Sequence, residues 1–140
     1  MRPKGVGATG WAIRASLALF LASLFFPALR FQDHSPVSGG QALAWGWWGL
    51  LTGDLAWFAN PAYLAGLILI SRRRVGGARI AAVGALGLAS LSVLAGEWWF
   101  NEGSGTPITG LGLAFYIWMA SLASLLVGTL LPAEDVARRG

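Results

Sequence analysis

Residues 80–100 read IAAVGALGLASLSVLAGEWWF and are almost entirely apolar. Glu97 is the single charged residue in this stretch, and about 20 apolar residues in a helix suffice to cross a hydrocarbon core of roughly 30 Å. A second apolar run of similar length covers residues 111–131, and further apolar segments cover 10–29 and 53–70. We therefore predict an all-α polytopic membrane protein, a single membrane domain with four transmembrane helices over about these four ranges.

The composition of the whole chain supports a membrane location. Hydrophobic residues make up 56% of the 140 residues and charged residues 11%, against roughly 25% charged in an ordinary soluble domain. The mean hydropathy is +0.62. The chain has no cysteine and a single histidine, His34, which excludes thiol redox chemistry, iron–sulfur clusters and a His-rich metal site. We expect neither a metal nor a cofactor.

Basic residues gather at three places along the chain. They are Arg2, Lys4 and Arg14 at the start, Arg72, Arg73, Arg74 and Arg79 after the second span, and Arg138 and Arg139 in the tail. The positive-inside rule then places both termini in the cytoplasm of a bacterial cell, the chain being a multi-pass inner-membrane protein. The alternative for the first span is a cleaved signal peptide, but the residues after it offer no good small-x-small cleavage site.

Tryptophan gives an independent indication of the same orientation. Six of the eight tryptophans fall at the predicted outer ends of the second and third spans: Trp45, Trp47, Trp48, Trp57, Trp98 and Trp99. Indole rings favour the headgroup region of a bilayer. This distribution predicts an aromatic belt at the outer face.

The second span is longer than a single upright crossing. Residues 41–70 are interrupted by Gly53-Asp54 and by Asn60-Pro61. We predict an interfacial segment over 42–51, then a bend, then a crossing helix kinked at Pro61, which cannot donate a backbone hydrogen bond. Such a kink is either part of a broken helix that lines a transport site or a bend that a neighbouring helix tolerates.

Polar residues occur at two depths in the predicted spans. Asn60, Ser90 and Ser121 fall near the midplane on three different helices, and form either a ligand layer or hydrogen bonds between helices. Near the outer interface lie Asp54, Glu97, Arg30 and His34, which form either a polar cluster or a set of solvated side chains.

The basic residues of the loop after the second span have two interpretations. Arg72, Arg73, Arg74 and Arg79 either attract anionic lipid headgroups or only fix the topology. Nucleic-acid binding is not expected, because the basic residues are divided among three short membrane-proximal segments.

Small residues recur at four-residue spacing, as in helices that pack closely within a bundle or against a partner. They are Gly77, Ala81, Ala85 and Ala89, with Gly84, Ser92 and Gly96 beside them, and Ala120, Ser124 and Gly128 on the fourth span.

One stretch carries a resemblance. The motif W-G-W-W-G-L-L at residues 45–51, followed by A-W-F-A-N-P at 56–61, is similar to a motif of small bacterial four-helix inner-membrane proteins to which no activity is assigned. It lies within residues 45–61 of the 140-residue chain, and it implies a membrane fold without implying a function.

Three functions remain open. The first is a non-catalytic accessory or interaction subunit that associates with another membrane protein or with itself. The second is a small homo-oligomeric transporter or channel with a kinked second helix, and the third is a membrane enzyme that uses Asp54, Glu97 and His34. The absence of a soluble domain and of a recognisable catalytic motif favours the first.

Overall fold

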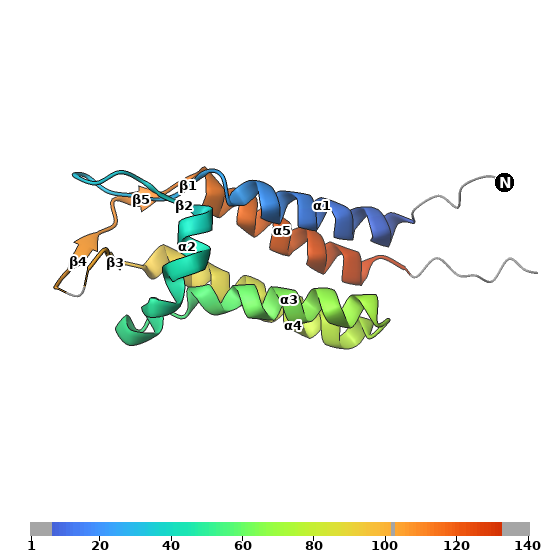
Figure 1. The fold of residues 1–140 in the computed structure, drawn as a ribbon. Coiled ribbons are helices and arrows are strands. Elements are labelled where there is room, and N and C mark those ends of the chain that lie inside the picture. Colours follow the sequence, from blue (N-terminus) through green and yellow to red (C-terminus); the bar gives the residue numbers. More distant parts are fainter. Residues whose placement is uncertain (1–6, 102, 133–140) are drawn as a thin grey trace, which may run out of the picture.

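The computed structural model describes residues 7–101 and 103–132, which are mostly helical (Figure 1). Four helices run side by side: α1 (Ala8–Ser23), α3 (Ala59–Ser71), α4 (Val75–Ser90) and α5 (Leu113–Leu130) (Figure 1). A short helix, α2 (Gly39–Trp45), lies across one end of this bundle (Figure 1). The expected helical fold is thus confirmed.

Within the part of the chain that the structure describes, two helices are long and apolar enough to cross a membrane. They are Val75–Leu94, in which α4 continues into the 3-10 turn η3 (Leu91–Leu94), and Leu113–Leu130. Only 22% of the apolar stretch of the first and 33% of that of the second are buried inside the chain. The core helix of a soluble protein would be mostly covered, so these two helices present apolar side chains to their surroundings. Ala8–Ser23 and Ala56–Ser71 are also apolar but shorter.

The bundle is held together by small residues on α4. Its buried positions are Ala78, Ala82, Ala85 and Ala89, a spacing of four, three and four residues that forms one stripe along a helix. This stripe packs with the core of α3 and α5, where Leu122 and Leu125 are fully buried. The small side chains let the helix backbones approach closely.

Two helix pairs build the bundle. α1 packs along α5 and α3 packs along α4, while α4 also contacts α5 (Figure 1). Gly128 of α5 sits against α1, where an added Cβ would lie 3.4 Å from the Cβ of Ala12. The start of α1, the α3–α4 turn and the end of α5 share one end of the bundle, which we call the arginine end because Arg72–Arg74 form that turn (Figure 1).

The opposite end carries five short strands and is called the strand end. β1 (Pro27–Arg30) pairs antiparallel with β2 (Val37–Ser38) and with β5 (Gly110–Leu111). β3 (Glu97–Trp99) pairs with β4 (Gly105–Pro107). The all-α prediction did not include these two sheets. Beyond the helix ends the backbone must find new hydrogen-bond partners, and neighbouring loops supply them by pairing.

The first helix ends at Ser23, six residues before the end expected at residue 29. Pro27 lies four residues after this end, and a proline disfavours helical backbone at the residue that precedes it. α2 also crosses here, because the amides of Gly39 and Gly40 donate to the carbonyls of Phe26 and Leu24. Gly39 is required at this crossing, since an added Cβ would collide with the Ser23 carbonyl.

The segment expected as the second span divides into several pieces. A 3-10 helix η1 (Gly46–Thr52) follows α2, and Gly53 then turns the chain in the left-handed conformation with φ of 81°. A second 3-10 turn, η2 (Ala56–Phe58), leads into α3. Pro61 is the third residue of α3, and the 3-10 turn η2 leads directly into that helix. Pro61 therefore stands near the start of α3 and not in the middle of a helix.

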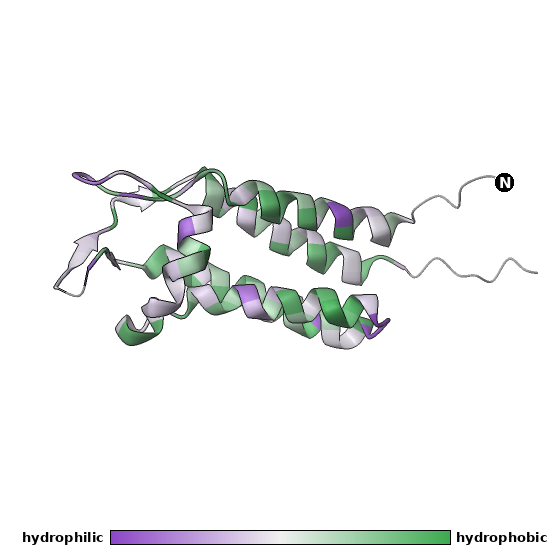
Figure 2. Ribbon diagram, viewed as in Figure 1, coloured by the Kyte–Doolittle hydropathy of each residue, from purple (hydrophilic) through white to green (hydrophobic). Residues whose placement is uncertain are grey.

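Figure 2 shows hydrophobic colours along all four long helices and hydrophilic colours at the α3–α4 turn. The third expected span, 80–100, also begins and ends earlier than predicted. α4 starts at Val75 and the helical conformation stops at Leu94, so that Glu97 falls on a strand.

Candidate functional site

Asn60 joins three elements at the strand end. Its Nδ2 donates to the carbonyl of Trp57 at 2.9 Å, and its Oδ1 accepts from the indole N–H of Trp118 at 3.1 Å. The Trp57 carbonyl is the one that Pro61, which has no N–H, leaves without its helical donor. Asn60 therefore completes the start of α3 and ties it to α5.

Trp57 extends this network to the crossing helix. Its indole N–H donates to the carbonyl of Leu43 in α2 at 2.8 Å. An added Cβ on Gly46 would lie 2.7 Å from the Trp57 ring, so a glycine is needed where the indole passes under α2. The W-G-W-W-G motif thus contributes the glycine that admits Trp57.

Asn60, Ser90 and Ser121 each have different surroundings. Ser90 is exposed and its hydroxyl donates to the carbonyl of Leu86 on its own helix. Ser121 is fully buried, and its Oγ has no hydrogen-bond partner within the described chain. None of the three side chains bonds to another.

A buried hydrogen-bond chain lies in the middle of the bundle. The Ser16 hydroxyl donates to the Ser121 carbonyl at 2.8 Å and lies 2.8 Å from the Tyr63 hydroxyl. Because Ser16 has only one proton to donate, the Tyr63 hydroxyl is the donor in that second bond. Phe20 stacks on the Tyr63 ring at 4.9 Å. Sequence reasoning missed Ser16 and Tyr63; the one available signal was a tyrosine in an otherwise apolar run.

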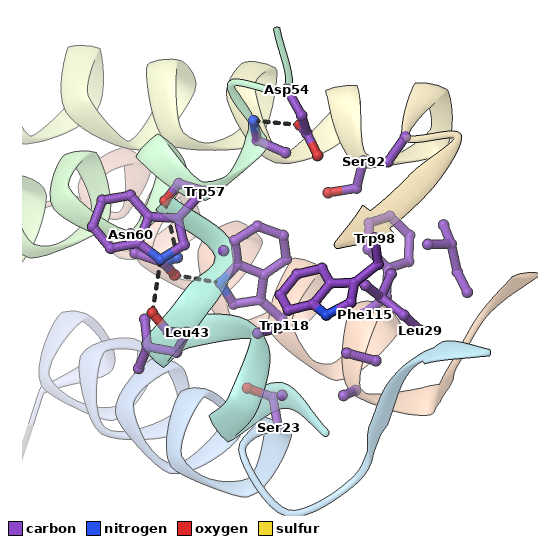
Figure 3. A pocket seen from close by; sticks show the side chains of 18 of the residues that line it. Ser23, Leu29, Leu43, Asp54, Trp57, Asn60, Ser92, Trp98, Phe115 and Trp118 are labelled. Carbon is purple, nitrogen blue, oxygen red and sulfur yellow. Dashed lines mark hydrogen bonds between the residues drawn. The ribbon is translucent and has the colours of Figure 1, made fainter. Parts of the chain in front are cut away.

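A cavity of about 120 Å³ opens at the strand end, beneath α2 (Figure 3). Its wall contains five aromatic side chains: Phe20, Trp57, Trp98, Phe115 and Trp118. The rest of the wall is mostly aliphatic and comes from α1, α2, α3 and α5, from the η3 turn and from the strands β1, β3 and β5. A cavity of this size can admit a benzene-sized molecule.

Asp54 and Glu97 line this cavity and also a second one of about 180 Å³ beside it. The sequence placed both near one interface, and the structure brings them to the boundary between the two cavities. Asp54 Oδ1 accepts the amide N–H of Ala56 at 2.9 Å, and Glu97 Oε1 accepts the indole N–H of Trp99 at 2.9 Å. Figure 3 shows the Asp54 carboxylate and the Ser92 hydroxyl turned toward each other from facing elements.

Arg30 and His34 lie apart from these carboxylates. Arg30 is exposed on β1 and pairs with Gly110 of β5, and the His34 ring stacks on Phe100 at 4.8 Å. Neither contributes to the wall of either cavity. Within residues 7–101 and 103–132, no group of three His, Asp or Glu side chains comes close enough to hold a metal ion.

The four arginines of the basic loop divide into two groups. Arg72, Arg73 and Arg74 form the α3–α4 turn, with Arg73 in the left-handed conformation at φ of 59°. Arg79 lies within α4, and its Nη2 donates to the carbonyl of Thr129 at 2.8 Å. A cation beside the last carbonyls of a helix interacts favourably with the helix dipole, so Arg79 stabilises the end of α5.

No protein-family model, curated protein or solved structure matches this chain. The similarity of the W-G-W-W-G-L-L motif to small inner-membrane proteins therefore remains a resemblance. The function has to be argued from the geometry of the chain itself.

Proposed function

We propose that this chain is a multi-pass protein of a bacterial inner membrane and an accessory or interaction subunit without catalysis of its own. The observation that carries the proposal is the outward face of α4. An added Cβ on Gly76, Gly84 or Gly87 would meet no atom within 4 Å. A helix turns about 100° per residue, which puts these glycines within about 80° of one another.

The glycines inside the bundle behave differently. An added Cβ would lie 2.9 Å from Leu125 at Gly66 and 3.4 Å from Ala12 at Gly128. Those two positions serve contacts between helices of this chain. A glycine costs a helix about 1 kcal/mol relative to alanine, so three glycines on an unoccupied face suggest close packing against a further helix, one that this chain does not supply.

The proposed topology has four spans and cytoplasmic termini. It is supported by the position of Arg72–Arg74 at the end where α1 begins and α5 ends, and by exposed apolar side chains on all four helices, including Leu21, Leu64, Ile80 and Leu130. α1 has 16 residues, or about 24 Å at 1.5 Å per residue, and a bilayer adapts to such a shorter helix by local thinning. Arg72–Arg74 would contact anionic headgroups.

The test is an affinity purification of the tagged full chain from native membranes into nanodiscs. The recovered particles are analysed by mass spectrometry and by particle mass. We expect a second membrane protein in fixed proportion, and we expect the Gly84→Leu/Gly87→Leu variant to lose it. Ala123→Leu is the matched control, because Ala123 is an exposed small residue on α5. Recovery of a single copy of this chain alone would contradict the proposal.

The same measurement tests the transporter alternative. A particle built from several copies of this chain and nothing else would favour it. Its structural argument is weaker than the sequence suggested, because Pro61 lies in the first turn of α3 and not in the middle of a helix. The enzyme alternative loses His34 as a partner of the carboxylates, since His34 stacks on Phe100.

A further inference from the structure

The cavity at the strand end has the wall of a small-molecule site. Its aromatic side chains come from α1, η2, β3 and α5, which are far apart in sequence. Two of the indoles, Trp57 and Trp118, are fixed by hydrogen bonds to Leu43 and Asn60. A pocket with rigid aromatic walls and a few placed polar groups is typical of ligand sites.

The charged side chains that line this cavity are all acidic. Asp54 and Glu97 are the charged residues among those that line the cavity, all of which belong to the described part of the chain. Asp54 uses one carboxylate oxygen to accept the Ala56 amide, which leaves the second oxygen for another donor. Aromatic faces and carboxylates both attract organic cations, and together they bind ammonium groups.

The two cavities define how such a molecule would lie. All five aromatic side chains line the cavity beneath α2 and none lines the second, while Asp54, Ala95 and Glu97 line both cavities. An apolar body would occupy the aromatic cavity. Its cationic group would then stand at the shared boundary beside the Asp54 carboxylate, while Glu97, whose Oε1 accepts from the Trp99 indole, would add negative charge at the rim. The second cavity leads outward between the η1–η2 turn and the η3–β3 connection.

We propose that the cavity at the strand end binds a small organic cation with an aromatic or apolar body, its ammonium group held beside Asp54 and Glu97. The site is distinct from the glycine face of α4 and does not depend on the proposed partner. The ligand class follows from the side chains that line the cavity. The aromatic rings would contact the apolar body, and the negative charge of the two carboxylates would attract the cation. No basic side chain is found among the described residues that line the cavity.

The binding test uses the purified full chain in uncharged maltoside micelles, with benzyltrimethylammonium as the probe. Bound probe is measured by equilibrium dialysis after subtraction of protein-free micelles, and indole fluorescence reports on Trp57, Trp98 and Trp118. The matched control is neopentylbenzene, in which carbon replaces the charged nitrogen. We expect saturable one-to-one binding of the cation and at least about tenfold weaker binding of its neutral analogue.

Variants assign the binding to this cavity. Asp54→Asn and Glu97→Gln remove the charges but keep the oxygens that accept from Ala56 and Trp99. We expect the double variant to bind at least about tenfold more weakly and Glu97→Gln alone about threefold more weakly. Asp33→Asn is the control with the same charge change, since Asp33 is exposed and lines neither cavity.

The proposal is overturned if the cation binds no better than its neutral analogue, or if the double variant binds like the native chain. Circular dichroism and gel filtration check that each variant folds. If Asp54→Asn does not fold, Glu97→Gln and Trp98→Leu decide the question, and unchanged binding in both would overturn it.

The ammonium group could belong to a free molecule or to a lipid headgroup, and a second arm separates these sources. Probe binding is compared in nanodiscs with one fixed fraction of phosphatidylglycerol, in which the remaining lipid is either an uncharged glycolipid or phosphatidylethanolamine, so that the surface charge stays the same. A lower apparent affinity with phosphatidylethanolamine identifies the aminophospholipid as the occupant. An unchanged affinity identifies a free organic cation.

Discussion

Removing the side chain of Asn60 should destabilise the bundle, and the size of the loss should depend on whether Pro61 and Trp118 are present. Asn60→Ala deletes the donor to the Trp57 carbonyl and the acceptor for the Trp118 indole. Each hydrogen bond contributes about 0.5–1.5 kcal/mol, and hydrogen bonds between membrane helices average about 0.6 kcal/mol. We therefore expect the free energy of unfolding to fall by about 1–3 kcal/mol, partly offset by the better helix propensity of alanine.

Two further substitutions divide this loss between the two bonds. Pro61→Ala restores a backbone N–H that can donate to the Trp57 carbonyl, so the cost of Asn60→Ala should fall by about 1 kcal/mol in that background. Trp118→Phe removes the indole donor and keeps an aromatic ring. In that background the cost should fall by the contribution of the Trp118 bond, about 0.5–1 kcal/mol.

The measurement is reversible unfolding in mixed micelles, followed by circular dichroism as the fraction of denaturing detergent is raised. The four combinations of each pair form a double-mutant cycle, which isolates the coupling energy. A cost for Asn60→Ala that is the same in all three backgrounds would refute the reasoning. It would mean that the amide contributes through packing alone and that Pro61 creates no unmet acceptor.

Four other substitutions test the packing and the hydrogen bonds of the bundle. Gly66→Ala should destabilise the bundle by about 1–3 kcal/mol, because the new Cβ meets buried Leu125 at 2.9 Å. Gly84→Ala should instead raise the stability of the isolated chain by roughly 0.4–1 kcal/mol. The same unfolding assay compares the two variants, and equal effects would contradict the distinction between glycines inside the bundle and glycines on its outer face. Tyr63→Phe removes a buried hydroxyl and should lower the free energy of unfolding by about 0.5–1.5 kcal/mol, and a neutral result would contradict the hydrogen bond to Ser16. Arg79→Met should cost about 1 kcal/mol and speed amide hydrogen exchange in the last turn of α5, and exchange that stays at the native rate would argue against the bond seen there.

The strand end shows why the sequence alone did not predict the two small sheets. The sequence predicts that the first span continues to residue 29, whereas Pro27–Arg30 form the strand β1. This strand forms because β1 meets one nearby and one distant segment: Leu29 pairs with Val37 and with Leu111. Pairing between segments about 80 residues apart leaves no trace in local propensity or periodicity.

The roles of individual polar residues were equally hard to assign in advance. Depth along a helix placed Asn60, Ser90 and Ser121 at one level, but depth says nothing of the direction in which a side chain points. Asn60 bonds to Trp118, Ser90 bonds to its own helix, and Ser121 is buried with an unpartnered hydroxyl. Direction depends on how each helix is rotated in the bundle, and the packing of small residues on α4 decides that rotation.

The sequence by itself determined the helical character of this protein and the two longest apolar helices, because about 20 consecutive apolar residues have few alternatives to a helix. It also marked the interrupted stretch around Gly53-Asp54, where the left-handed turn occurs. Only the tertiary structure decided the early end of α1, the placement of Pro61 in a first turn, and the meeting of Asp54 and Glu97 at one cavity. These features depend on contacts between segments far apart in the chain, and such contacts exist only once the helices have packed.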